Sequence, residues 1–363
     1  MRYHAMDRPA RSLQAREQGI AVMEPTDNDS IAALSAPTPA PRGRRTDASP
    51  WAIVLAGGEG KRLQAFTTLR DGVTVPKQFC HFRDERTLLG TTIDRALAIT
   101  PRDHVVVVVV EAHRDWWEPV VAHLPAANVL SQPANRGTAV AILHALVHIH
   151  LSDPSPRVIV MPSDHDFDDE TAVTRCVRRA IGTTEIYPSE VVLLGIAPTH
   201  LDADYGLIVP GAGTRQTSRQ VRAFVEKPTL TAAAQLTRAG ALWNSFIFAC
   251  TGAALYDAFE TAVPALARSY LAGLARCGGN PRAMAALFEE LPDCDFSRDV
   301  LQRNAGRLRM IEVPACGWTD LGTPARLAAW LERHREAPFW REHLVPRHHG
   351  TDGFSGALQA GGA

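Results

Sequence analysis

Short, unbroken apolar runs separated by helix-length segments constrain the fold of this chain more than any other feature. Both faces of each expected strand should be buried, as in a parallel or mixed sheet that helices cover. Strands alternating with helices predict an α/β domain with a doubly wound, mixed but mostly parallel sheet, which binds ligands at the carboxyl ends of its strands. The expected strands are 51–56, 104–110, 157–161, 191–197, 221–226 and 244–250, and the expected helices are 87–99, 137–151 and 170–181.

Composition divides the chain into three parts. Residues 1–49 are rich in Ala, Pro, Arg, Ser and Asp and can bury little apolar area, so a disordered leader is expected there. One large folded domain is expected over residues 50–335, and within it residues 251–304 should be mainly helical, before one more strand and a final loop and helix. Residues 336–363 are expected to form a C-terminal tail.

Charge, hydropathy and cysteine usage exclude several classes of protein. Lys plus Arg (38) nearly balances Asp plus Glu (39), so the chain has no overall basic surface for a nucleic acid. Its longest aliphatic run, 105–110, is far too short to span a bilayer, so no membrane partner is expected. The six cysteines form no CxxC pair, which indicates buried thiols and a cytoplasmic location. The sequence leaves open whether the chain forms a homo-oligomer.

A glycine-rich loop follows the first expected strand in the segment LAGGEGKRL. Gly57, Gly58 and Gly60 would let the backbone approach an anionic ligand closely, and Lys61 and Arg62 could neutralise a polyphosphate. The alternative is an ordinary strand-to-helix turn with solvated cations. Two familiar phosphate loops fit badly, since a Rossmann fingerprint needs a third glycine where leucine stands, and a Walker loop needs Ser or Thr after the lysine.

Two aspartates, far apart in the sequence, are candidates for a metal site. Asp164 follows the strand expected at 157–161, and Asp320 lies in the turn between Trp318 and Gly322. Mg²⁺ prefers oxygen ligands and commonly takes one or two carboxylates together with substrate phosphates. Taken singly, either residue could instead be a helix cap or an ordinary turn residue.

Taken together and in order, these motifs resemble the sugar-phosphate nucleotidyltransferases, especially their mannose-1-phosphate guanylyltransferase (GDP-mannose pyrophosphorylase) branch. The resemblance covers about residues 51–330 and departs from the family in two places: QAFTT follows the leucine of the glycine loop where the family has Pro-Leu-Thr, and NRGTA replaces GRNTA. The motifs that carry it are LAGGEGKRL with VPKQF, QPANRGTA (132–139), PSDH (162–165), YGLI (205–208), VEKP (225–228) and WTDLGT (318–323).

The resemblance implies a nucleotide-diphospho-sugar transferase fold, Rossmann-like, with a helical C-terminal portion, so that 50–335 would be the nucleotidyltransferase domain. It implies Mg²⁺ as cofactor, and as substrates an NTP, expected to be GTP, and a sugar 1-phosphate, expected to be mannose 1-phosphate. The sugar phosphate would attack the α-phosphorus in line and release pyrophosphate. Such a transfer depends mainly on positioning and electrostatic stabilisation.

The resemblance also assigns roles to individual residues. Arg62 would hold the β- and γ-phosphates, Lys77 the α-phosphate and Lys227 the sugar phosphate, while Asp164 and Asp320 would bind the metal. Gln132 and Gly137 would contact the base. The full implied nucleotide site is Leu55, Ala56, Gly57, Gly58, Gly60, Lys61, Arg62, Lys77, Gln132, Gly137 and Thr138, and the implied sugar-phosphate site is Gly206, Glu226, Lys227 and Asn244.

Two other functions remain open. A glycosyltransferase on a similar scaffold would use a DxD metal motif, and SDHD offers Asp164 and Asp166 at that spacing. A non-catalytic sensor of sugar nucleotides would have lost a metal ligand or a phosphate-binding cation, whereas all five implied catalytic residues are present. Release of pyrophosphate from GTP and mannose 1-phosphate separates these alternatives.

Overall fold

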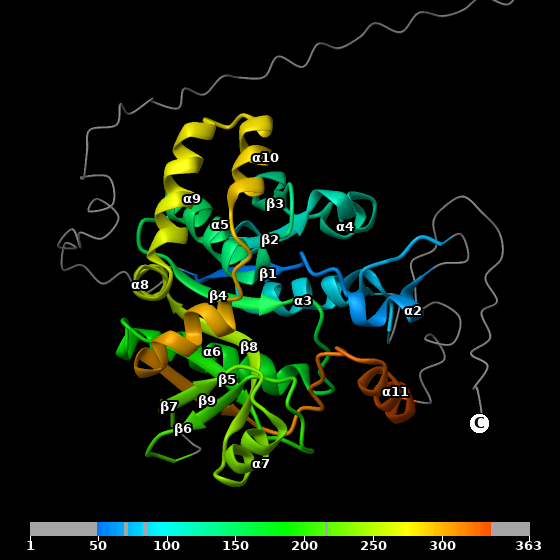
Figure 1. Cartoon of the computed structure of the whole chain (residues 1–363), viewed down its shortest axis with the longest axis vertical. Helices are drawn as coiled ribbons and strands as arrows, with labels where there is room; N and C mark the ends of the chain where they lie inside the picture. The colour runs from blue at the N-terminus through cyan, green and yellow to red at the C-terminus, as the bar shows by residue number, and fades with distance from the viewer. Residues whose placement is uncertain (1–48, 69–71, 83–85, 215–216, 335–363) are drawn as a thin grey trace, which may run out of the picture. The chain divides into compact units, whose positions relative to one another are not determined.

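The computed structural model describes residues 49–68, 72–82, 86–214 and 217–334, and within these ranges it contains a nine-stranded sheet (Figure 1). The expected leader falls outside the described residues except for its last position, and the expected tail falls outside them entirely.

The strands follow one another from β3 in the upper half of Figure 1, below α10, to β6 in the lower half. Their order is β3-β2-β1-β4-β8-β5-β9-β7-β6, with a further pairing of β8 and β6. The short strands β3 and β6 were not among the expected ones, since four residues are too few for a clear pattern. The strands are β1 (Trp51–Leu55), β2 (Val105–Val110), β3 (Val129–Gln132), β4 (Arg157–Pro162), β5 (Val191–Ile196), β6 (Leu207–Pro210), β7 (Arg219–Val225), β8 (Leu242–Thr251) and β9 (Leu308–Val313).

The mixed sheet is confirmed, but parallel pairing predominates only in the half that β1 to β4 form. There β1 runs parallel to β2 and β4, and β2 runs parallel to β3. Strand β8 is antiparallel to β4, β5 and β6, and β7 is antiparallel to β6 and β9, so among these strands only β5 and β9 pair in parallel. An unbroken apolar run indicates burial on both faces of a strand and does not indicate the strand's direction.

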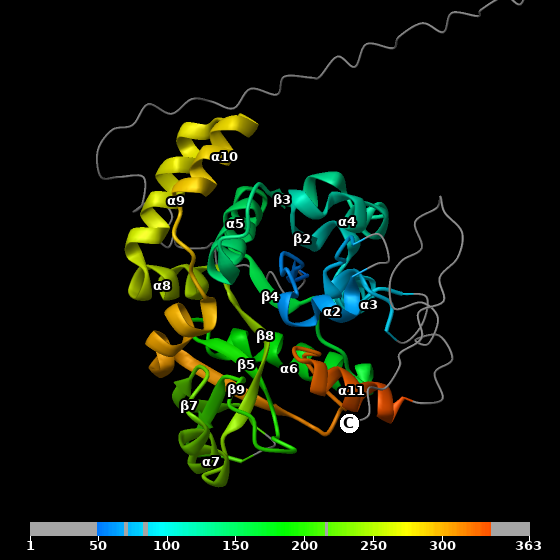
Figure 2. The same ribbon diagram turned by 45° about the vertical axis from the view of Figure 1, so that its right-hand side comes forward.

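Helices cover both faces of the sheet, as a doubly wound fold requires. In β1, Trp51 and Ile53 face a core that includes residues of α5 and α8, whereas Ala52 and Val54 face a second core with α3. Helices α9 and α10 extend the first core beside α5 (Figure 2). All six cysteines are buried and free, as expected.

The expected helices are confirmed with small shifts at their ends, and the helical portion after β8 is confirmed as well. Side-chain caps begin several of them; for example, Asp169 accepts a hydrogen bond from the backbone N–H of Ala172 at the start of α6. No helix in the described ranges is long and apolar enough to cross a membrane. The helices are α2 (Gln64–Thr67), α3 (Leu88–Leu97), α4 (Arg114–Val121), α5 (Gly137–Ser152), α6 (Glu170–Ile186), α7 (Leu230–Arg238), α8 (Gly252–Ala262), α9 (Pro264–Cys277), α10 (Pro281–Glu290) and α11 (Pro324–Arg333).

Candidate active site

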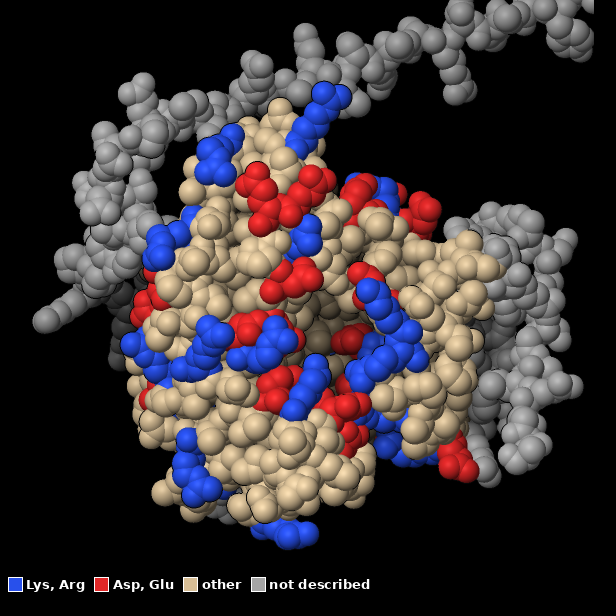
Figure 3. Space-filling view, viewed as in Figure 1, with Lys and Arg blue, Asp and Glu red and all other residues tan. Residues whose placement is uncertain are grey.

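A cavity of about 710 Å³ lies at the carboxyl ends of β1 and β4, where the sequence places the candidate residues. Figure 3 shows a hollow in one face of the protein with lysine, arginine and acidic side chains around it. Segments from both halves of the sheet reach it. The predicted residues that line it are Leu55, Gly57, Gly58, Gly60, Lys61, Arg62, Lys77, Gln132, Gly137, Thr138, Asp164, Gly206, Glu226, Asn244 and Asp320.

The glycine loop is held in place by side chains from two other motifs. The side-chain amide of Gln78 donates to the carbonyl oxygens of Ala56 (3.0 Å) and Gly58 (2.7 Å), and that of Asn135 donates to the Gly57 carbonyl (3.0 Å). Ala56 itself is buried and donates its backbone N–H to Val108, so it anchors the loop and does not line the cavity.

Gly60 lies where the loop turns back on the VPKQF segment. Its φ is +63°, in the left-handed region that favours glycine, and a Cβ at this position would lie 3.3 Å from the backbone nitrogen of Lys77. A glycine here therefore permits close approach of the loop to the lysine.

Lys77 lies between the two candidate metal ligands. Its ammonium is 3.0 Å from Oδ2 of Asp164 and donates a hydrogen bond to the backbone carbonyl of Asp320, and the residue is only 6% exposed. Burial acts to raise the pKa of Asp164, but the charges of Lys77 and His165 outweigh it and hold that pKa below its ordinary value. The Asp164 carboxylate is therefore ionised at neutral pH.

The Asp320 carboxylate is held by several donors. Its Oδ1 accepts hydrogen bonds from the Tyr205 hydroxyl (3.0 Å) and the Gly322 backbone (2.9 Å), and both of its oxygens accept from the Arg326 guanidinium (3.1 and 2.9 Å). The backbones of Asp166 and Thr319 exchange two hydrogen bonds, which bring the Asp320 turn next to the end of β4.

The donor set fits Mg²⁺. Two carboxylates line a cavity beside a loop that can bind phosphates, and Mg²⁺ needs only one or two carboxylates when phosphates supply the other ligands. Each carboxylate already faces a protein cation, since Lys77 contacts Asp164 and Arg326 contacts Asp320.

The two cations of the glycine loop make exposed ion pairs. Arg62 contacts Oδ2 of Asp204 at 3.0 Å, and Lys61 contacts Glu59 at 2.8 Å. Their side chains are 55% and 74% exposed, so solvent screens both pairs and both cations are available to a ligand.

Three of the four implied sugar-phosphate residues, Gly206, Glu226 and Asn244, line the part of the cavity next to β6, β7 and β8. A Cβ on Gly206 would lie 2.4 Å from Oε2 of Glu226, and the Asn244 backbone donates to the Gly206 carbonyl. Burial, and then the nearby charge of Asp295, raise the pKa of Glu226 to about 7. Lys227 does not line the cavity, and its ammonium lies 3.7 Å from Glu226 with the side chain 60% exposed.

The implied base-binding residues pack against a segment that sequence reasoning missed. Gly137 has a φ of +83°, and a Cβ there would lie 2.3 Å from the carbonyl oxygen of Cys294. The hydroxyl of Thr138 accepts a hydrogen bond from the backbone of Phe296. The buried side-chain nitrogen of Gln132 has no hydrogen-bond partner among the described residues. The missed segment contributes Asp293, Cys294, Asp295, Ser297 and Arg298 to the cavity.

Other lining or supporting residues were also missed. Gln78 and Tyr205 stand inside motifs that were recognised, so proximity in sequence could have indicated them. Asp204 and Arg326 lie just outside recognised motifs, and their roles depend on contacts between segments more than a hundred residues apart.

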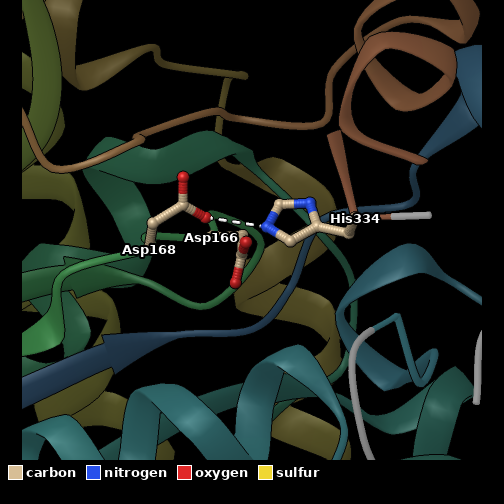
Figure 4. A group of neighbouring side chains, drawn as sticks. All are labelled: Asp166, Asp168 and His334. Carbon is tan, nitrogen blue, oxygen red and sulfur yellow. Dashed lines mark hydrogen bonds and ion pairs between the residues drawn. The ribbon is translucent and has the colours of Figure 1, made fainter. Parts of the chain in front are cut away.

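A separate group of possible metal ligands, Asp166, Asp168 and His334, lies outside the cavity lining (Figure 4). His334 contacts Asp168 at 2.9 Å through Nε2, and the Trp330 indole N–H donates to Asp166 at 2.6 Å. These contacts attach α11 to the segment after β4. Asp166 is buried, and it belongs to this attachment and not to the cavity.

The chain is similar in sequence to several curated proteins. The xanthan biosynthesis protein XanB of Xanthomonas campestris (strain B100) is 31% identical over 279 residues, which are 75% of this chain and 57% of that protein. Mannose-1-phosphate guanylyltransferase RfbM of Salmonella typhimurium is 27% identical over 279 residues, 75% of this chain and 56% of that protein. The chain thus spans little more than half the length of these curated relatives.

Solved structures give the same picture of the fold. A Thermus thermophilus protein described as a mannose-1-phosphate geranyltransferase superposes with a TM-score of 0.65 at 26% identity, covering 76% of this chain and 77% of its own. The family model described as nucleotidyl transferase matches residues 51–335, which include every lining residue of the cavity. The chain belongs to the nucleotidyl transferase family.

Proposed function

We propose that the chain transfers a nucleotidyl group from an NTP to a sugar 1-phosphate and releases pyrophosphate. The observation that carries the proposal is the position of Lys77, which contacts Asp164 and Asp320 in the cavity that also contains the glycine loop and Glu226. This reaction needs cations for the phosphates, carboxylates for a metal, and polar groups in another part of the cavity for the sugar. We assign the domain to residues 50–335.

In this proposal the chain acts by positioning two anionic substrates. The glycine loop and Arg62 bind the β- and γ-phosphates, and Lys77 moves from Asp164 to the α-phosphate when the nucleotide binds. Lys227 and Glu226 hold the sugar phosphate and its hydroxyls, with Gly206 and Asn244 beside them. Mg²⁺, held by Asp164 and Asp320, would neutralise charge on the phosphates. The attacking oxygen comes from the sugar phosphate, so no protein nucleophile is needed.

GTP and mannose 1-phosphate are the proposed substrates. Relatives named mannose-1-phosphate guanylyltransferase, at 27% to 34% identity, support this choice, and so do XanB and AlgA, whose names place them in polysaccharide biosynthesis. Gln132 and Gly137 would contact the base. Because NRGTA replaces the commoner GRNTA in the base loop, the nucleotide must be tested directly.

The glycosyltransferase alternative is less well supported. Its DxD motif would require both Asp164 and Asp166 at the metal, but Asp166 is buried against Trp330 outside the cavity. The sensor alternative predicts binding without turnover.

A matrix of four NTPs against several sugar 1-phosphates, with and without Mg²⁺, tests the proposal. We expect pyrophosphate release to be greatest with GTP and mannose 1-phosphate and to depend on Mg²⁺. Turnover with another NTP and sugar 1-phosphate would support the proposed reaction and contradict the proposed substrates. Binding of a sugar nucleotide without pyrophosphate release in any combination would favour the sensor and contradict the proposal.

A further inference from the structure

Arg326, the third residue of α11, lies at the centre of a buried ionic network beside the cavity. Its guanidinium contacts Asp202 (2.6 Å) and Asp320 (2.9 Å), and it lies 3.6 Å from Asp204. The same group stacks 4.0 Å from the centre of the Tyr205 ring, and the side chain is only 8% exposed. Nothing in the sequence motifs assigned a role to this residue.

The two proposed metal ligands differ in how firmly their cations are held. Lys77, which contacts Asp164, has a flexible stem and would move to the α-phosphate. Arg326 is fixed by Asp202 and by the Tyr205 ring as well as by Asp320, so it has no comparable freedom. An arginine also keeps its charge at any physiological pH. The positive charge beside Asp320 is therefore a permanent part of the site.

We propose that Arg326 is a positioning residue for the metal site: it orients the Asp320 carboxylate and offsets its charge, so that the free protein binds a divalent cation weakly and the cation binds together with the nucleotide. This inference rests on the proposed function. It follows from the charge balance, because both candidate ligands face a protein cation until triphosphate supplies additional negative charge.

The consequence is an order of binding. A free carboxylate pair would attract Mg²⁺ before any substrate arrived. With Lys77 and Arg326 in place, the phosphates of the nucleotide must first draw Lys77 away from Asp164, and they carry the metal with them. Asp320 meanwhile keeps its orientation, since the Tyr205 hydroxyl and the Gly322 backbone also hold it.

The test measures Mn²⁺, as a probe for Mg²⁺, by electron paramagnetic resonance of the unbound ion with the full chain and no substrate. The main variant, Arg326→Met with Asp202→Asn, removes one positive and one negative charge together, so the net charge of the network is unchanged. We expect it to bind Mn²⁺ at least about tenfold more tightly than the wild type, as expected when a neighbouring cation is lost. Arg326→Lys, which retains the charge, should stay close to the wild type.

A matched control is available on β9. Arg309 also stacks on a tyrosine, 3.4 Å from the ring centre of Tyr187, and pairs with Glu190 at 3.0 Å, but it does not line the cavity. Arg309→Met should leave Mn²⁺ binding unchanged. Adding Asp320→Asn to the main variant should abolish its gain in Mn²⁺ affinity. Unchanged Mn²⁺ affinity in the folded main variant, or an equal gain in Arg309→Met, would overturn the inference.

A wild-type measurement keeps the inference testable if the main variant does not fold. Wild-type protein should bind Mn²⁺ at least about tenfold more weakly alone than with GTP present, after correction for Mn²⁺ bound to free GTP. Equal affinities would overturn the role of Arg326 even if pyrophosphate release is observed. Conversely, the Mn²⁺ measurements could give the expected results while no substrate pair is turned over. That outcome would support the role of Arg326 at the metal site and contradict the proposed reaction.

Discussion

The two ends of the cavity are built differently. At the proposed nucleotide end, next to the parallel strands β1 to β4, the buried Lys77 pairs with Asp164, whereas Lys61 and Arg62 are exposed. At the proposed sugar end, next to β6, β7 and β8, Glu226 is largely buried with a pKa raised to about 7, and Lys227 is exposed. We infer that the Lys77–Asp164 pair is preorganised, whereas Glu226 can change its charge near neutral pH.

The largest effect should follow from Lys77→Ala, which removes the buried lysine. Losing one preorganised electrostatic contact typically lowers turnover by on the order of 10²-fold or more. Asp164→Asn should lower kcat by a similar factor. The measurement is kcat for pyrophosphate release with GTP and mannose 1-phosphate. Lys61→Ala removes an exposed lysine from the same cavity and should change kcat only a few-fold, as is usual for exposed charges. Similar losses in both lysine variants would contradict the difference between the buried Lys77–Asp164 pair and the exposed cations of the same end.

Gly206→Ala should have an intermediate effect, confined to the sugar end. Its Cβ would lie 2.4 Å from the Glu226 carboxylate and would displace it. We expect KM for the sugar phosphate to rise roughly tenfold, as for a lost hydrogen bond to a charged group, with KM for the NTP unchanged. Gly182→Ala in α6, where nothing lies within 4 Å of the new Cβ, is the control and should leave both KM values alone. A matching rise in KM for the NTP would show that the two ends are not separable.

The raised pKa of Glu226 predicts a pH-dependent stability difference. The unfolded chain has the ordinary pKa of 4.5, and the folded chain has a pKa of about 7, so ionisation destabilises the fold progressively as the pH rises from 4.5 to 7. Glu226→Gln should therefore match the wild type near pH 4.5 and be more stable by on the order of 3 kcal/mol above pH 7. Urea unfolding at several pH values measures this difference. A constant difference at all pH values would refute the shift.

The smallest effect is expected for Asp204→Asn. This substitution releases Arg62 from its exposed ion pair, and such a pair contributes about 0.2–1 kcal/mol, so KM for the NTP should fall by no more than about fivefold. Glu118→Gln, which breaks an exposed pair with Arg114 away from the cavity, should leave that KM unchanged. A rise in KM for Asp204→Asn would mean that Asp204 itself assists the nucleotide.

The nucleotide end could be predicted from the sequence because its signals are local. Glycines after a buried strand and an aspartate after another strand place Gly60 and Asp164 at one edge of a sheet. Their assigned roles remain predictions. The residues 293–298 could not be predicted, because they reach the cavity through a tertiary contact, in which the Cys294 carbonyl accepts from the Ala139 backbone. Arg326 was missed for the same reason, since Asp202 lies 124 residues away in sequence.

Attachment of the α11 segment has a consequence for biosynthesis. The indole of Trp330 bonds to Asp166 across 164 residues, and the backbone of Thr319 pairs with the same aspartate. Synthesis proceeds from the N-terminus, so the glycine loop, Lys77 and Asp164 leave the ribosome long before this segment exists. A nascent chain can thus complete most of its sheet while still lacking the carbonyl and carboxylate of Asp320. Such an intermediate would be folded around an incomplete cavity, which would be completed only when the Asp320 turn and α11 dock.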